Sequence, residues 1–170
     1  MGEVLYEVSY QFDMVVFTPL IMLVAIPVLY LREKQKGGGR LTGGSEILLT
    51  ASWVVILFVA IFAGKYQLDM YNTVMNAYKN GEYQIVEGYV ENFDPMPSEG
   101  HKVESFDING VHFSYSDYTV MTGYHNAKSK GGVITGDGQY LKIGYIYYND
   151  SVGNIIVYIE EILDVEYTIA

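Results

Sequence analysis

The chain has 170 residues, half of them hydrophobic, with a formal net charge of −10 and no cysteine. It therefore has no disulfide, no thiol nucleophile and no thiolate metal ligand. From Gly64 onward it carries 15 Asp or Glu against 6 Lys or Arg, so this part repels nucleic acid and anionic lipid headgroups.

Residues 1–13 contain the acidic side chains Glu3, Glu7 and Asp13 and no basic one. A secretory signal peptide begins with basic residues and ends at a small-residue cleavage site. Because both features are missing, we expect a retained segment that lies outside the cytoplasm.

Two apolar segments without a charged residue follow, at 14–31 and 47–64. A helix needs roughly 20 apolar residues to cross the hydrocarbon core of a bilayer, so the pattern predicts two antiparallel transmembrane helices. Pro27 predicts a kink in the first of them. Small, polar or kinking residues mark the expected contacts of these helices with each other or with a larger complex: Thr18, Pro27, Thr50, Ala51, Ser52 and Ala60.

The loop at 32–46 joins the two apolar segments and is basic, with four Lys or Arg against two Glu. Basic residues in short loops stay on the cytoplasmic side of a membrane. We therefore predict a cytoplasmic loop and an extracytoplasmic C-terminal domain, which in a bacterium lies in the periplasm at the inner membrane.

The hydrophobic period changes near residue 82. Residues 65–81 keep a helical spacing up to Asn80-Gly81, which predicts a helical stalk. Residues 82–170 then alternate with a period of two, which predicts a small β domain. Its expected strands are 84–93, a hairpin turning at Asn109-Gly110, and a second hairpin over 140–148 and 154–160, with a long loop at 116–138.

Five strands are typical of an OB-like or SH3-like small barrel. Gly88 and Gly144 fall inside predicted strands, where a barrel bends sharply. The predicted fold class is therefore a membrane α+β protein, with a two-helix transmembrane hairpin followed by a five-stranded β-barrel.

Five titratable residues lie within 25 positions and have the chemistry of a zinc site or an acid–base pair: His101, Glu104, His112, Asp117 and His125. Their spacing matches no metal motif, and the chain has no nucleophile elbow, phosphate-binding loop or dinucleotide-binding motif. We therefore predict a protein that is not an enzyme and that uses no cofactor or metal.

Tyrosine is the least ordinary part of the composition, because 14 of the 17 tyrosines follow residue 63. Tyrosine is common both in strands and at protein interfaces, so we expect one tyrosine-lined surface that engages another protein. The run from residue 100 to 118, with the loop that follows, predicts a rim of the barrel that binds a partner or a ligand: Phe106, Phe113, Tyr115, Asp117, Tyr118, Tyr124, His125 and Asn126. The alternative is a hairpin whose loop packs over the open end of the barrel.

Residues 86–134, with their VENF, ESF, NGV and YSDY pieces, resemble a group of small bacterial membrane proteins of uncharacterised function. The resemblance implies two N-terminal helices before a small β domain, and no activity. The architecture is also similar to that of two-helix, β-barrel effectors of bacterial anti-phage signalling, which sense a cyclic nucleotide.

Two functions are therefore expected. The first is a non-enzymatic accessory or scaffolding subunit, held in the lipid bilayer and docked on a larger membrane complex or in a homo-oligomer. The alternative is a membrane effector that senses a ligand of the cyclic-nucleotide type. No nucleic acid partner is expected in either case.

Overall fold

The chain forms two compact units, one of Met1–Gln11 with Met70–Ala170 and one of Phe12–Asp69. The computed structural model describes residues 2–9, 21–22, 25–28, 30, 32, 43–100, 102–119 and 121–162, and for residues 43–50 it describes the backbone alone.

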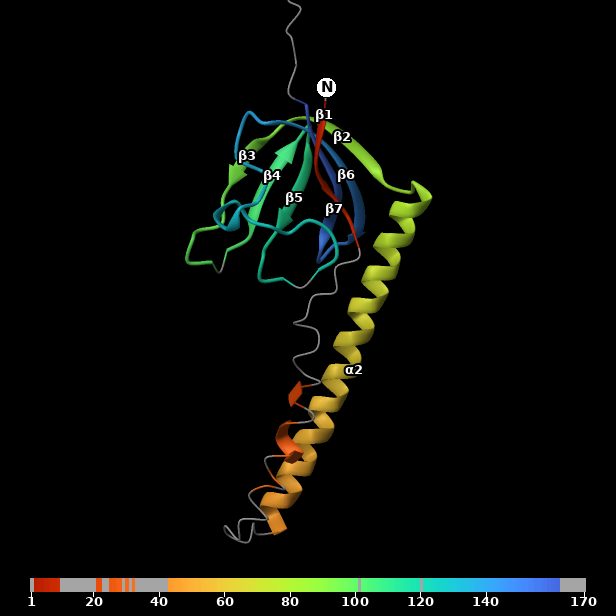
Figure 1. Ribbon diagram of the computed structural model, residues 1–170, viewed down its shortest axis with the longest axis vertical. Helices are drawn as coiled ribbons and strands as arrows, with labels where there is room; N and C mark the ends of the chain where they lie inside the picture. Colours follow the sequence, from red (N-terminus) through yellow and green to blue (C-terminus); the bar gives the residue numbers. More distant parts are fainter. Residues whose placement is uncertain are drawn as a thin grey trace, which may run out of the picture. The chain divides into compact units, whose positions relative to one another are not determined.

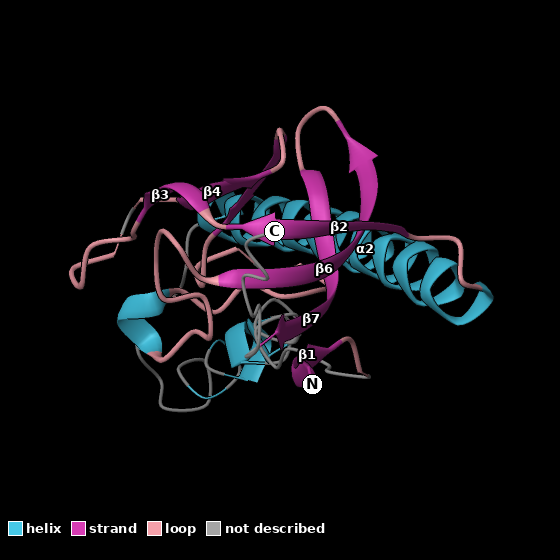
Figure 2. Ribbon diagram, turned by 90° about the horizontal axis from the view of Figure 1, so that it is seen from above, coloured by secondary structure: helices cyan, strands magenta, loops and turns pink. Residues whose placement is uncertain are grey.

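The first unit is built on two antiparallel sheets, which can be followed in Figures 1 and 2. The four-stranded sheet has the order β1 (Gly2–Glu7), β7 (Gly153–Ile162), β6 (Tyr140–Asn149) and β2 (Gln84–Tyr89). The three-stranded sheet has the order β3 (Glu91–Asp94), β4 (Glu104–Ile108) and β5 (Val111–Tyr115). A 3₁₀ turn, η2 (Lys128–Lys130), lies in the long loop between β5 and β6.

Both predicted hairpins are confirmed. β4 and β5 pair with Ile108 opposite Val111, and the two turn residues have φ of 48° at Asn109 and 79° at Gly110. Positive φ at both positions is what a type I′ turn requires, and Asn-Gly meets that requirement at the lowest steric cost. The second hairpin joins β6 and β7, which pair from Leu141 to Asn149.

The predicted strand at 84–93 is divided at Val90. β2 pairs with β6 in one sheet, whereas β3 pairs with β4 in the other. Val90 itself is buried, and it exchanges backbone hydrogen bonds with the segment before β6, donating to the Gln139 carbonyl and accepting from the Gly138 N–H, both at 2.9 Å. Both backbone polar groups of Val90 are therefore paired where the chain passes from one sheet to the other.

The N-terminal strand β1 was not predicted. It pairs with β7, with Gly2 opposite Ile162 and Glu7 opposite Tyr158. The sequence does contain the alternating pattern of a strand here, because the apolar residues Val4, Tyr6 and Val8 occupy alternate positions beside the acidic Glu3 and Glu7.

Residues from both sheets and from the long loop meet in one hydrophobic core. A second, smaller core holds the last turns of α2 (Gly43–Asn80) against the four-stranded sheet, where Met70 and Val74 are buried with Val8, Ile155 and Val157. The predicted stop at Asn80-Gly81 is confirmed, since Glu82 N–H donates to the Ala77 carbonyl at 2.8 Å and Gly81 has a φ of 71°. The last eleven residues of α2 are therefore part of the β domain.

The predicted fold class is wrong. The described residues form one long helix and two sheets of four and three strands, in place of a two-helix hairpin and a closed five-stranded barrel. The described residues form seven strands in place of five, because β1 joins from the N-terminal segment and because the 84–93 strand divides into β2 and β3. Most of the apolar segment at 14–31 lies outside the described residues, and those of its residues that are described are helical.

Between Ala51 and Asn80, α2 is long and apolar enough to cross a membrane. Seven large apolar side chains are exposed between residues 54 and 62: Val54, Val55, Leu57, Phe58, Val59, Ile61 and Phe62. Such a surface is costly in water and is stable against lipid.

Candidate functional site

Four aromatic residues of the predicted rim lie in the main core. Phe106 and Phe113 are fully buried and stack with their ring centroids 5.1 Å apart. Tyr115 and Tyr124 are also buried, and their rings meet edge to face at 5.3 Å. These four rings pack against one another inside the domain and therefore stabilise the fold.

The other four rim residues lie at or near the surface. Tyr118 is exposed, Asp117 is partly buried, and both follow the end of β5. Asn126 is exposed, and the Nδ1 atom of His125 lies 2.8 Å from the Gly123 carbonyl oxygen, to which it donates. A binding role for these four residues stays a prediction.

Four of the five residues considered for metal or acid–base chemistry are described, and they do not form a metal-binding group. His101 lies outside the described residues. In the part of the chain that the structure describes, no three His, Asp, Glu or Cys side chains gather where a metal ion could bind.

Glu104, one of those residues, is instead a buried anchor at the start of β4. Its carboxylate accepts the Met96 N–H at 3.2 Å, the Lys128 N–H at 3.1 Å and the Tyr115 hydroxyl at 2.8 Å. Burial, reinforced by this carboxylate, raises the pKa of Tyr115 above its ordinary value, so the hydroxyl keeps its proton and donates. Glu104 thereby ties two loops to the three-stranded sheet.

A second polar group lies on the outer side of the three-stranded sheet. The Nδ1 atom of His112 is 2.7 Å from Asp107 Oδ1, and Asn92 Nδ2 donates to Asp107 Oδ2 at 2.9 Å. The hydrogen bond with His112, supported by that from Asn92, lowers the pKa of the Asp107 carboxyl. Since Asn92 has a φ of 54° at a register shift in β3, these bonds hold an irregular strand in place.

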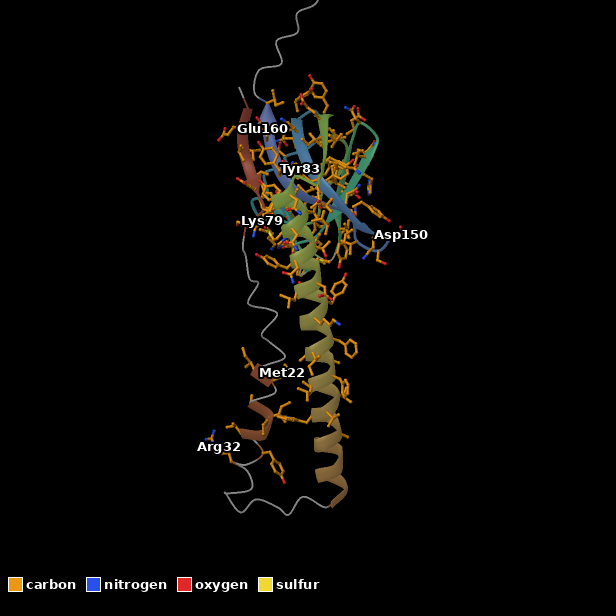
Figure 3. The ribbon with its side chains drawn as sticks, turned by 90° about the vertical axis from the view of Figure 1, so that its right-hand side faces the viewer. Met22, Arg32, Lys79, Tyr83, Asp150 and Glu160 are labelled. Carbon is orange, nitrogen blue, oxygen red and sulfur yellow. The ribbon has the colours of Figure 1, made fainter. Side chains whose placement is uncertain are left out.

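An organised group of polar and aromatic side chains lies on the outer side of the four-stranded sheet, the side viewed in Figure 3. Three tyrosine hydroxyls donate to carboxylates there: Tyr78 to Glu7 at 2.6 Å, Tyr140 to Glu87 at 3.1 Å and Tyr158 to Glu160 at 2.9 Å. We call this surface the Tyr–Glu face; its members are Glu7, Tyr78, Tyr83, Ile85, Glu87, Tyr89, Tyr140, Lys142, Tyr158 and Glu160.

The strand register explains why these residues gather. Lys142 of β6 lies between Glu87 of β2 and Glu160 of β7, and Tyr158 lies opposite Glu7 of β1. Residues directly opposite each other in neighbouring strands point to the same side of a sheet. One side of all four strands therefore contributes to the Tyr–Glu face, while the alternate residues enter the core.

Close aromatic contacts fix the tyrosines of this face. The rings of Tyr89 and Tyr140 meet edge to face at 4.8 Å, and those of Tyr78 and Tyr83 stack at 5.4 Å. Gly144 was expected to bend a barrel strand, but it makes room for Tyr83, because a Cβ at this glycine would lie 3.0 Å from the ring. These contacts restrict the rotation of the four tyrosine rings.

The electrostatics of the Tyr–Glu face keep its hydroxyls protonated. The hydrogen bond to Glu87 raises the pKa of Tyr140, and burial together with Glu160 raises that of Tyr158. Three carboxylates on the face are opposed by one ammonium group, that of Lys142, which lies 3.7 Å from Glu160. The face is thus acidic at neutral pH.

No family model, curated protein or solved structure matches this chain. The resemblance inferred from the sequence stays a prediction.

Proposed function

We propose that this protein is a non-enzymatic accessory or scaffolding subunit of a membrane complex, and that its β domain docks onto another protein. The observation that carries the proposal is the Tyr–Glu face, in which several tyrosines are fixed by hydrogen bonds and ring contacts on one side of a sheet. Tyrosine is enriched in the energetically dominant parts of protein interfaces.

The pre-organisation of this face supports docking. An aromatic side chain that is already fixed loses little conformational entropy on association, so more of its contact energy appears as affinity. The buried Glu104 supports a non-enzymatic role, since its carboxylate is bonded to two backbone N–H groups and a hydroxyl of the domain itself.

Membrane attachment through α2 is part of the proposal. β1 and the strands from β2 onward belong to one unit, so the chain leaves the domain after β1 and re-enters it through α2. A segment that starts and ends on the same side of a membrane crosses it an even number of times. We therefore propose a two-pass topology, with residues 14–31 as the other apolar segment and the basic 32–46 loop in the cytoplasm.

Reporter fusions test this topology. We expect a reporter before Met1 and one after Ala170 to be active on the same, extracytoplasmic side, and a reporter inserted at Gly38 to be active in the cytoplasm. Protease added to sealed vesicles of known orientation provides the control. Reporters at the two termini that report opposite sides would contradict the pairing of β1 with β7 in the membrane-bound protein.

Gentle extraction from the native membrane tests the accessory role. We expect the full chain, solubilised in a mild detergent or a membrane-excising polymer, to elute with at least one other protein at a fixed ratio. Light scattering gives the mass, and mass spectrometry gives the composition. A chain that elutes alone as a monomer under conditions that keep known membrane complexes intact would count against the proposal.

A further inference from the structure

The acidity of the Tyr–Glu face restricts what can dock on it. We propose that its occupant is a segment of a different protein that presents Arg or Lys side chains, with Arg favoured. This inference rests on the proposed docking function and names the chemistry of the partner.

The carboxylates of the face retain capacity for a cationic partner. Each of Glu7, Glu87 and Glu160 accepts a tyrosine hydroxyl, and a carboxylate offers about four acceptor positions. Lys142 Nζ lies 3.7 Å from Glu160 Oε2, an ion pair beyond hydrogen-bond distance. Guanidinium groups bind carboxylates through two parallel hydrogen bonds, so each Glu can take an Arg without losing its tyrosine.

The aromatic rings favour Arg for a second reason. Ile85 and Tyr89 on β2 are 58% and 37% exposed, and they continue the face beyond the carboxylates. A guanidinium plane stacks on a tyrosine ring more readily than an ammonium group does. An Arg-bearing segment can therefore contact the rings and the carboxylates of the same face together.

Other occupants fit the charge less well. A second copy that docked by the same face would bring carboxylates together across a twofold axis. The chain's own residues 163–170 carry Asp164 and Glu166 and no basic residue. Its basic loop at 32–46 lies across the membrane in the proposed topology. Anionic lipid headgroups and nucleic acid have the same sign of charge as the face.

Site-specific photocross-linking of the full chain in its native membrane tests the inference. A benzophenone amino acid would replace Ile85 on the face or, as a control, Tyr147, whose 55% exposure is similar and which lies on the opposite side of the sheet from the face. We expect an adduct with one other protein from position 85 and none from position 147. The cross-linked peptide should carry Arg or Lys.

Charge reversal supplies the second readout. Glu87→Lys should reduce the yield of this adduct at least tenfold, and so should 0.5 M salt, because the attraction is electrostatic. Glu91→Lys is the matched control, since Glu91 is an exposed carboxylate on the other sheet, and it should leave the yield unchanged. Thermal unfolding of each variant confirms that the domain is folded.

Distinct outcomes would overturn the inference. An adduct with a second copy, with lipid, or with a peptide that lacks Arg and Lys would show that the partner chemistry is wrong although docking occurs. An adduct yield that Glu87→Lys does not reduce would also show that the proposed partner chemistry is wrong. If gentle extraction yields a complex but position 85 gives no adduct, the Tyr–Glu face is not the docking surface. If no complex is found, the proposed function itself fails.

Discussion

Replacing Glu104 by alanine is expected to lower the free energy of unfolding of the β domain by about 3–5 kcal/mol. The substitution leaves two backbone N–H groups and the Tyr115 hydroxyl without their acceptor, at a site where the residue has no solvent exposure. Urea unfolding of the full chain in detergent, followed by near-ultraviolet circular dichroism of the tyrosines, measures the change. Fluorescence is unsuitable, because the single tryptophan, Trp53, lies in the other unit.

Two variants make this result specific. Glu91→Ala removes an exposed carboxylate from the neighbouring strand β3 and should change stability by no more than about 0.5 kcal/mol. Glu104→Gln keeps one acceptor oxygen but points its amide NH₂ group at the N–H and O–H donors that the carboxylate accepts. We therefore expect a loss of stability between those of Glu91→Ala and Glu104→Ala. A Glu104→Ala protein as stable as the Glu91→Ala protein would show that the three hydrogen bonds do not hold the two loops.

The second large effect is expected at the N-terminus. Val8→Asn should destabilise the domain by about 2–4 kcal/mol, because it places an amide in an apolar site. Val8 is 4% exposed and packs in the second core with Met70 and Val74, and its N–H donates to the Val157 carbonyl at 2.8 Å. The variant should also speed amide hydrogen exchange in the last turns of α2.

Val4→Asn is the matched control for this experiment. Val4 belongs to the same N-terminal segment, but its side chain is 53% exposed, so the substitution should cost less than about 1 kcal/mol. Equal effects of the two substitutions would mean that the contact between the N-terminal segment and α2 adds nothing to stability.

Short sequence patterns were sufficient to predict the turns and helix ends whose conformation depends only on neighbouring residues. Asn109-Gly110 specifies its own turn, and Asn80-Gly81 ends its own helix. The pairing of β1 with β7 depends on residues more than 140 positions apart, and nothing in either strand alone indicates the other. The division at Val90 was missed for a similar reason, since the apolar alternation continues through it into Phe93.

The candidate site was harder to predict because alternation shows two sides of a strand without showing which is buried. Tyr115 and Tyr124 were expected at a surface and lie in the core, whereas Tyr140 and Tyr158 form the Tyr–Glu face. Glu104 could have been recognised, since it shares a strand side with Phe106 and Ile108. An acidic residue in that position predicts a buried carboxylate with its own hydrogen-bond donors.

The pairing of the first and last strands has a consequence for biosynthesis. β1 leaves the ribosome well before its partner β7, which begins at Gly153, so at ordinary translation rates β1 waits roughly 7 to 30 s for it. During that interval the edge of β1 and the apolar side of the α2 end have no sheet to cover them. A chain interrupted anywhere before Gly153 keeps these surfaces uncovered permanently, which marks it for proteolysis. The edge of β1 is therefore covered only after β7 has been synthesised.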